Sequence, residues 1–334
     1  MIRLKPLSEQ VMVITGASSG IGLTTARLAA AKGVKVFLVA RNEPALAQAV
    51  EDIGHAGGTA AYAVADVGDY DQLRAAAARA VARFGRIDSW VNNAGVAIYA
   101  KLVDTPQDEH AQLFRTNYFG VVNGSLAAIE HLHDGGALIT VGSIGSDLPT
   151  PILSAYAASK HAVKAYVEAL RMELHADGIP IAVSLIKPSG IDTPIGQHAA
   201  NHGPGEALVP QPLYAPEIVA GAILHAAEHG TRDITVGGIG RAQVLIGQHF
   251  PWLLDLLTPI LSKAVFDPKR PKTPGDDLFA SNEAGRERSG MEKARDFSTY
   301  TAAKLHPLAT LGIGAAIIGG GALLVSGLRK RKDN

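Results

Sequence analysis

Tyr156 and Lys160 form the pair of residues whose types and spacing most directly suggest chemistry. They lie four positions apart within residues 154–175, a stretch of helical periodicity, so the two side chains share one helix face. A tyrosine has an ordinary pKa of about 10, which is too high for efficient proton transfer near neutral pH. A lysine cation beside the phenol favours the phenolate and lowers that pKa. The pair therefore predicts a tyrosine that exchanges a proton with a substrate, although such a pair also occurs on ordinary amphipathic helices.

A glycine-rich turn at residues 15–22, with the sequence TGASSGIG, could bind phosphate. It follows a short apolar run and opens a helical pattern, so it would bring the backbone and a helix N-terminus close to a pyrophosphate. The same residues match G-x-S-x-G, the nucleophile elbow of α/β-hydrolases. That elbow comes after several strands, whereas this turn follows the first, and Gly22 extends the turn as dinucleotide binding requires. We therefore favour a dinucleotide site over a serine hydrolase.

The elements that must position these residues alternate between strand-like and helical patterns throughout residues 1–240. The strand-like runs are almost continuously apolar, which is typical of strands covered on both faces. They comprise residues 11–15, 34–40, 60–66, 89–93, 137–142, 181–186 and 233–236. Helical patterns lie between them, at residues 21–32, 43–53, 70–84, 107–131, 154–175 and 216–229. This alternation predicts an α/β domain with a Rossmann-like, doubly wound parallel sheet of about seven strands.

Five motifs, in this order and at this spacing, resemble those of the short-chain dehydrogenase/reductase (SDR) family, over about residues 8–240. They are the turn at 15–22, Asp66-Val67, Asn92-Asn93-Ala94-Gly95, Asn117, and Ser143 followed by Tyr156-Ala157-Ala158-Ser159-Lys160. The resemblance implies an NAD(P)-dependent oxidoreductase that transfers hydride between a nicotinamide and a carbonyl or secondary alcohol.

The resemblance also assigns roles to individual residues. It makes Tyr156 the general acid in reduction and the base in oxidation, with Lys160 lowering its pKa and holding the nicotinamide ribose. Ser143 would hydrogen-bond the substrate oxygen, and Asn117 would anchor a water of the proton relay. Ser189 interrupts the Pro-Gly pair usual in the family, a mild departure. The expected cofactor contacts are Gly16, Ser18, Ser19, Gly20, Ile21, Gly22, Arg41, Asp66, Val67, Asn93, Ala94, Gly95, Tyr156, Lys160, Ile191 and Thr193.

Arg41, which follows the second predicted strand, bears on the choice of cofactor. NAD enzymes of this kind place an acidic residue at that strand end, where it accepts from the ribose hydroxyls. A guanidinium there suits a 2′-phosphate instead. The sequence therefore favours NADP(H) over NAD(H), the alternative being a solvated arginine. Asp66 would accept from the adenine amino group with either cofactor.

The composition excludes several classes of function. The 334 residues contain 31 Lys and Arg and 31 Asp and Glu, so there is no basic excess for binding nucleic acid. Cysteine is absent, which excludes disulfides, thiol catalysis and thiolate metal sites. The histidines form no His-Glu-x-x-His motif, and we expect no metal site.

A second function stays open on the sequence, namely a cofactor-binding scaffold or redox sensor without turnover. The set of Asn117, Ser143, Tyr156 and Lys160 argues against it, because a scaffold need not keep a proton relay. The resemblance also implies assembly as a homodimer or homotetramer through the helices that carry Asn117 and Tyr156.

Beyond residue 240 the sequence changes character. Residues 241–266 read as an apolar helical extension, 267–307 as a largely irregular linker, and 329–334 as a basic tail. Residues 308–328 carry no charge, and as a helix they would be roughly 32 Å long, about the thickness of a bilayer core. Their glycines weaken a helix in water but are tolerated in lipid, which favours a transmembrane helix over a buried core helix.

This reading predicts a chain anchored to a membrane by its C-terminal helix, with the catalytic domain in the cytoplasm. It also predicts a hydrophobic small-molecule substrate, lipid- or steroid-like, because such a substrate would explain why a reductase is anchored.

Overall fold

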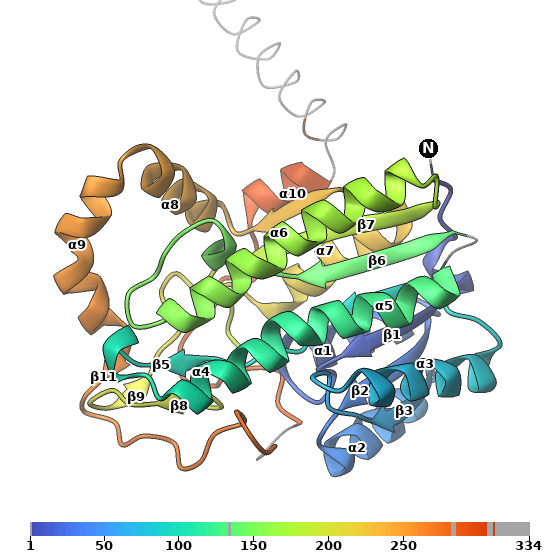
Figure 1. Ribbon diagram of the computed structural model, residues 1–334. Helices are drawn as coiled ribbons and strands as arrows, with labels where there is room; N and C mark the ends of the chain where they lie inside the picture. Colours follow the sequence, from blue (N-terminus) through green and yellow to red (C-terminus); the bar gives the residue numbers. More distant parts are fainter. Residues whose placement is uncertain (1, 133–134, 282–284, 306–309, 311–334) are drawn as a thin grey trace, which may run out of the picture.

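The computed structural model describes residues 2–132, 135–281, 285–305 and 310. At its centre lies a seven-stranded sheet in the order β10-β7-β6-β4-β1-β2-β3 (Figure 1). Every neighbouring pair in this sheet is parallel. The predicted Rossmann-like α/β fold with a seven-stranded parallel sheet is confirmed. The strands are β1 (Val11–Thr15), β2 (Lys35–Ala40), β3 (Thr59–Val64), β4 (Ser89–Asn92), β6 (Gly136–Val141), β7 (Ile181–Pro188) and β10 (Asp233–Val236).

Helices cover both faces of the sheet, which explains why its strands are apolar on both sides. In β1, Met12 and Ile14 belong to one buried core and Val13 to the other, since successive side chains of a strand point to opposite faces. One face is covered by α1 (Gly20–Ala31), α2 (Glu43–His55) and α7 (Pro216–His229). The other is covered by α3 (Tyr70–Phe84), α5 (Gly120–Leu132) and α6 (Ser154–Ala176).

Short polar side chains begin α2 and α3, and a glycine ends α3. The side chain of Asn42 accepts a hydrogen bond from the Ala45 N–H at 2.9 Å and begins α2, and Asp69 accepts from the Gln72 N–H at 3.1 Å and begins α3. Gly85 ends α3 in the left-handed conformation, at φ 84°. These caps give hydrogen-bond partners to backbone groups that a helix end leaves without one.

The helix predicted at residues 107–131 is interrupted near its middle. It consists of α4 (Gln107–Phe114), a π-helical turn (Arg115–Phe119) and α5. The extra residue of a π-turn rotates the following side chains, and such turns are frequent at functional sites. Here the turn contains the buried Asn117.

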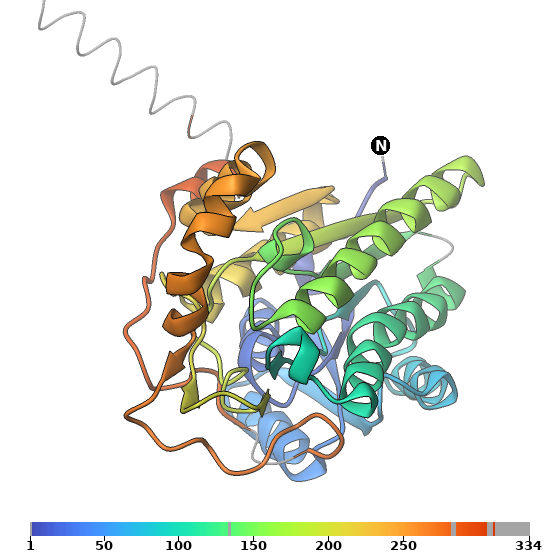
Figure 2. The same cartoon turned by 60° about the vertical axis from the view of Figure 1, so that its left-hand side comes forward.

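Two further helices, α8 (Gly238–His249) and α9 (Pro251–Ala264), stand at one end of the molecule beside the main layers (Figures 1 and 2). Small strand pairs connect this end to the domain. β5 (Ile98–Tyr99) pairs with β8 (Ala200–Asn201), and β9 (Glu206–Ala207) pairs with β11 (Phe266–Asp267).

No helix in the described ranges is both long and apolar enough to cross a membrane. α6 has 23 residues but carries charged side chains along its length. α9 is apolar but has only 14 residues, about 21 Å of helix. The span expected at 308–328 lies outside the described residues except for Thr310. Two predictions are therefore corrected: the transmembrane helix in the fold and the membrane-anchored, cytoplasm-facing localisation have no support.

The segment predicted as an irregular linker follows β11 and ends in a short helix, α10 (Thr299–Leu305). Figure 1 shows its orange part running past β9 and β8 before it returns to α10, which lies against β10 and α7. Between residues 268 and 298 it contains no helix or strand longer than a single bridge in its described parts. It is nevertheless tied to the α/β domain by backbone groups of residue 277 and of residues 285–295, as for example where the Arg295 N–H donates to the Leu213 carbonyl at 2.9 Å.

Candidate active site

The carboxyl ends of the sheet strands open into a cavity of about 1050 Å³. The strand order reverses between β1 and β4, and α/β sheets bind ligands at such a switch point. All of the expected site residues line this cavity except Gly22 and Asn117. Those that line it are Gly16, Ser18, Ser19, Gly20, Ile21, Arg41, Asp66, Val67, Asn93, Ala94, Gly95, Ser143, Tyr156, Lys160, Ile191 and Thr193.

The glycine-rich turn between β1 and α1 is shaped for close backbone approach. Gly16 has φ 64°, a left-handed conformation that favours glycine. A Cβ at Gly22 would lie 2.2 Å from the Gly16 carbonyl oxygen, so Gly22 allows the first turn of α1 to close against the loop. The N-terminus of α1 thereby faces the cavity, where its positive dipole end suits a phosphate group.

Asn93 holds the loop after β4 against this turn. Its side-chain amide donates to the Thr15 carbonyl at 2.9 Å and to the Gly16 carbonyl at 3.2 Å. In return, the Thr15 hydroxyl accepts from the Asn93 N–H at 2.9 Å and the Ala94 N–H at 3.2 Å. The side chain of Asn93 therefore fixes the turn, and Asn93, Ala94 and Gly95 all line the cavity.

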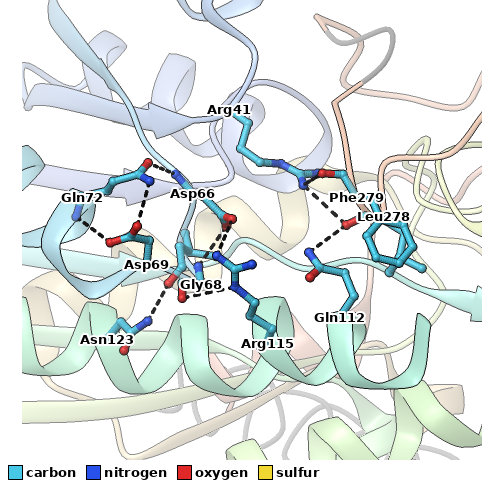
Figure 3. Close-up of polar contacts among 11 residues, drawn as sticks. Arg41, Asp66, Gly68, Asp69, Gln72, Gln112, Arg115, Asn123, Leu278 and Phe279 are labelled. Carbon is cyan, nitrogen blue, oxygen red and sulfur yellow. Dashed lines mark hydrogen bonds and ion pairs between the residues drawn. The ribbon is translucent and has the colours of Figure 1, made fainter. Parts of the chain in front are cut away.

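Asp66 stands at the end expected to hold adenine, in a network of its own (Figure 3). Its carboxylate accepts from the Gly68 N–H at 2.9 Å and lies 3.4 Å from the Arg115 guanidinium. The side-chain oxygen of Gln72 accepts from the Asp66 N–H at 2.9 Å. The carboxylate is thus held in place by neighbours before any ligand binds.

Arg41 follows the neighbouring strand end, β2, and binds backbone carbonyls of the C-terminal segment (Figure 3). Its guanidinium donates to the carbonyl of Asp277, to that of Phe279 at 3.2 Å and to that of Leu278 at 3.5 Å. No signal in the sequence indicated this contact, because it joins positions more than 230 residues apart.

Tyr156 is half-buried and lies beside Ser143 at the other end of the cavity. Burial raises the pKa of Tyr156, and a hydrogen bond with Ser143 acts in the opposite direction. Ser143 itself is fixed in a capping box, in which its hydroxyl accepts from the Gly145 N–H at 3.0 Å and its N–H donates to the Ser146 hydroxyl at 3.3 Å. At neutral pH the phenol is therefore protonated and is suited to donate a proton.

Lys160 lies one helical turn after Tyr156 and is buried. The ammonium nitrogen is 5.7 Å from the centre of the Tyr156 ring and donates to the Val141 carbonyl at 3.0 Å. Burial lowers the pKa of Lys160 to about 8. The expectation that Lys160 would leave the tyrosine with a lowered pKa is not met here, since burial has the larger effect on Tyr156.

Asn117 connects the π-turn to both the β4 loop and α6. Its side-chain oxygen accepts from the Val96 N–H at 2.8 Å. Its amide donates to the Val96 carbonyl at 3.0 Å and to the Ser159 hydroxyl at 3.1 Å, and that hydroxyl donates to the Tyr156 carbonyl at 2.7 Å. Asn117 therefore fixes the backbone around the tyrosine.

The remaining wall of the cavity is largely apolar and comes from the helices after the sheet. Residues of α8 and α9 that line it include Ile246, Leu253, Leu254, Leu257 and Leu261. The sequence predicts an apolar helical extension at residues 241–266 but singles out none of its residues as part of a pocket. The leucines of α9 recur at intervals of three and four residues, which marks one face of a helix. This spacing was the signal in the sequence that could have identified the pocket residues.

Asp147 is a buried carboxylate near the site that the sequence analysis missed. It follows the turn that carries Ser143 and pairs with Lys164 and with Lys187, the latter at 2.7 Å. Burial raises the pKa of Asp147, but the hydrogen bonds from the two lysines outweigh this and lower it. The trio joins the Ser143 turn to α6 and β7, and its members are too far apart in sequence to be recognised as a group.

Comparison with known proteins identifies the family. Residues 10–203 match the family described as short chain dehydrogenase. The chain is 39% identical over 329 residues to "Uncharacterized oxidoreductase YxnA" of Bacillus subtilis (strain 168), covering 95% of this chain and 91% of that protein. It is 32% identical over 252 residues to "Dehydrogenase/reductase SDR family member 7B" of Danio rerio, covering 72% and 81%. The chain belongs to the short-chain dehydrogenase family.

Solved structures agree with this assignment. A short-chain dehydrogenase/reductase from Burkholderia phymatum in complex with NAD matches with a TM-score of 0.68 and 25% identity, over 75% of this chain and 96% of that one. An alcohol dehydrogenase from the archaeon Thermococcus sibiricus, complexed with 5-hydroxy-NADP, shares the fold at a TM-score of 0.61 and 23% identity, over 68% and 95%. This short-chain dehydrogenase is an NAD(P)-dependent oxidoreductase.

Proposed function

We propose that this short-chain dehydrogenase uses NADP(H) to interconvert a hydrophobic carbonyl compound and its secondary alcohol. The observation that carries the proposal is that Ser143, Tyr156 and Lys160 line the same cavity as the glycine-rich turn. Residues of α8 and α9 supply an apolar wall of that cavity. A phosphate-binding turn and a proton donor then lie at two ends of the same space.

The residues of the cavity fit a dinucleotide. The close packing of Gly16 and Gly22 brings the N-terminus of α1 to the cavity wall, where Gly20 and Ile21 lie, and a side chain at Gly22 would clash with the turn. Thr193 lies against the same turn, since a Cβ at Gly20 would be 3.3 Å from the Thr193 Cβ. Bound nicotinamide would supply the hydride in reduction and accept it in oxidation.

The protein groups then manage the substrate oxygen. In reduction the Ser143 hydroxyl hydrogen-bonds the substrate oxygen. The protonated Tyr156 phenol donates a proton to this oxygen as negative charge develops on the oxygen. Lys160 provides positive charge beside the resulting phenolate. In oxidation the same phenolate accepts the proton. Asn117 keeps the Tyr156 backbone in place through Ser159.

The preference for NADP(H) rests on Arg41. It follows Ala40 at the end of β2, the position where an NAD enzyme of this type carries a carboxylate, and its side chain lines the cavity. A guanidinium can hold a 2′-phosphate by paired hydrogen bonds, whereas it offers nothing specific to a ribose hydroxyl pair.

Assembly of two copies through α5 and α6 belongs to the same proposal. Phe119, Leu126 and Met172 on or beside these helices are 52%, 46% and 68% exposed, which supports an apolar contact between copies. Light scattering of the purified chain after gel filtration would show a dimer or tetramer, and a monomer would contradict this part of the proposal.

The test is a cofactor-consumption screen with the purified full chain. We expect NADPH to be consumed with apolar ketones or aldehydes, at a higher kcat/KM than with NADH and with small polar carbonyls. Higher kcat/KM with NADH would overturn the cofactor assignment. Turnover confined to small polar carbonyls would overturn the substrate assignment.

A further inference from the structure

Two short stretches of the C-terminal segment, residues 277–281 and 285–289, run along the rim of the cofactor cavity. We call these two stretches the clasp. Neither lies within the residues matched to the family, which end at 203. Residues 282–284 are not part of the clasp.

The first stretch is bound from three sides of the rim. Arg41 at the end of β2 donates to the carbonyls of residues 277–279. Gln112 in α4 also donates to the Leu278 carbonyl, at 3.1 Å (Figure 3). The Asp277 N–H donates to the His198 carbonyl at 2.8 Å, and the two side chains lie 3.1 Å apart.

Leu278 anchors this stretch by its side chain. It is buried in a cluster that includes Val96, Leu113 and Ala155, against which Tyr156 also packs. An apolar side chain that leaves such a cluster exposes its surface to water, so Leu278 favours the docked position of the clasp. The first stretch thus reaches from the adenosine end toward the tyrosine.

The second stretch is bound to the glycine-rich turn. The Gly285 N–H donates to the Ser18 carbonyl at 2.7 Å, and the Gly20 N–H donates to the Arg286 carbonyl at 2.9 Å. Glu287 accepts from the Thr24 hydroxyl at 2.9 Å and forms an ion pair with Arg27, both on α1.

Ser289 continues the second stretch to the loop after β7. Its N–H donates to the Asp192 carboxylate at 3.1 Å, and its hydroxyl donates to the same oxygen. Asp192 stands between Ile191 and Thr193, two expected cofactor contacts. The clasp therefore contacts the end of β2, the glycine-rich turn and the loop after β7. These three elements are far apart in the sequence.

The clasp borders the cavity without filling it. Asp277 and Ser281 line the same space as Ser18, Arg41 and Asp66. A dinucleotide on the glycine-rich turn would therefore lie between the α/β domain and the clasp.

We propose that the clasp is the outer wall of the nucleotide site and retains the adenosine diphosphate half of the cofactor, with Arg41 as the positioning residue that holds it. This proposal rests on the proposed function, since it takes the cavity to be the cofactor site. Its consequence is kinetic. The bound nucleotide leaves only after carbonyl bonds to Arg41 and Gly20 have opened, so release is slower than from the same turn without a clasp.

The experiment measures NADPH dissociation from the full chain by stopped-flow fluorescence. Glu287→Gln removes the charge that binds Arg27 while keeping the shape of the side chain, and we expect it to speed dissociation at least threefold. Leu278→Ala removes the apolar anchor, and we expect at least a tenfold increase. The matched control for Glu287→Gln is Asp71→Asn, at an exposed ion pair on α3. The matched control for Leu278→Ala is Leu132→Ala, at a buried leucine in the core that α3, α5 and α6 form against the sheet. Both controls should leave the dissociation rate within twofold of wild type.

A second readout does not depend on the stability of these variants. Because the chain contains no cysteine, Ser281→Cys places a single thiol at the inner side of the clasp, and Ala56→Cys places one at an exposed site at the end of α2. NADPH should slow alkylation at position 281 at least fivefold and leave position 56 unchanged.

The outcomes separate the two proposals. Wild-type protein that binds neither NADPH nor NADH would contradict the proposed function, and the clasp proposal with it. Wild-type protein that binds NADPH, with unchanged release from both clasp variants or with equal alkylation at position 281, would overturn the clasp alone.

Discussion

The ammonium group of Lys160 lies 5.7 Å from the centre of the Tyr156 ring and is hydrogen-bonded to the Val141 carbonyl at the end of β6. The spacing of the pair on one helix places the cation next to the phenol. The burial of both side chains sets their pKa values, raising that of Tyr156 and lowering that of Lys160 to about 8. Helix periodicity therefore brings the two side chains together, and their surroundings shift the pKa of each.

Tyr156→Phe removes the proton donor while keeping the ring. Activity should fall by about 10²–10⁴-fold, the contribution of general acid–base catalysis, and NADPH binding should persist. Steady-state kinetics and nucleotide titration of the same preparation check both statements. Turnover within tenfold of wild type would contradict the assigned role.

Lys160→Met separates stability from catalysis. Because the folded-state pKa of Lys160 is lowered from 10.5 to about 8, the folded protein binds fewer protons than the unfolded chain between these values, and stability from this group rises with pH across that window. At pH 7 the buried charge costs about 3 kcal/mol at most. We expect the variant to be inactive yet more stable in urea at pH 7, with a smaller advantage at pH 10. A variant less stable than wild type at pH 7 would contradict the buried-charge explanation.

Arg41→Asp should reverse the cofactor preference. A carboxylate repels a 2′-phosphate and can accept from ribose hydroxyls, so the ratio of kcat/KM for NADPH to that for NADH should fall by at least about tenfold. The substitution also loosens the clasp, which would affect both nucleotides alike. The ratio is therefore the quantity to compare, and an unchanged ratio would remove Arg41 from cofactor selection.

Leu257→Gln tests the apolar wall. Leu257 lines the cavity, whereas its neighbour Leu256 does not line it and is 68% exposed, so Leu256→Gln is the matched control. A polar group in the wall should raise KM for long apolar carbonyls by about tenfold, the cost of losing one or two buried methylene contacts, and leave short ones little changed. Equal effects of the two substitutions would show that α9 does not contact the substrate.

Asp147→Asn should destabilise the turn that carries Ser143. The lowered pKa of Asp147 means that its carboxylate stabilises the fold above its ordinary pKa of 3.8 and loses that effect as pH falls through the lowered folded-state value. Removing the charge leaves Lys164 and Lys187 without their partner, and we expect a loss of about 2–4 kcal/mol at pH 7. Urea unfolding should show this difference shrinking below about pH 4. A difference that stays constant with pH would contradict the ion-pair origin.

Local pattern was enough to predict the α/β fold of this protein, because most of the strands are almost continuously apolar and helical periodicity marks the segments between them. The catalytic spacing was also local, since Tyr156 and Lys160 lie one helical turn apart. The motifs could therefore be read in order along the chain without knowledge of contacts between them.

The transmembrane prediction shows where local pattern misleads. It rested on an uncharged run at 308–328, outside the described residues, and the structure supports no membrane-spanning helix among those that it describes. A hydropathy pattern reports only that a segment avoids water and does not report what covers it.

The amino-acid sequence by itself determined the sheet, the glycine-rich turn and the spacing of the proton-transfer residues, because all three depend on neighbours within a few positions. Only the tertiary structure decided the π-turn at Asn117, the pairing of Asp147 with Lys164 and Lys187, and the binding of Arg41 to the carbonyls of residues 277–279. The contacts of Asp147 and Arg41 join positions that lie from 17 to more than 200 residues apart in the sequence. The π-turn depends on how the side chains around it pack. Propensity and periodicity act over one helical turn or one strand, and such partners are chosen by burial and hydrogen bonding in the assembled fold.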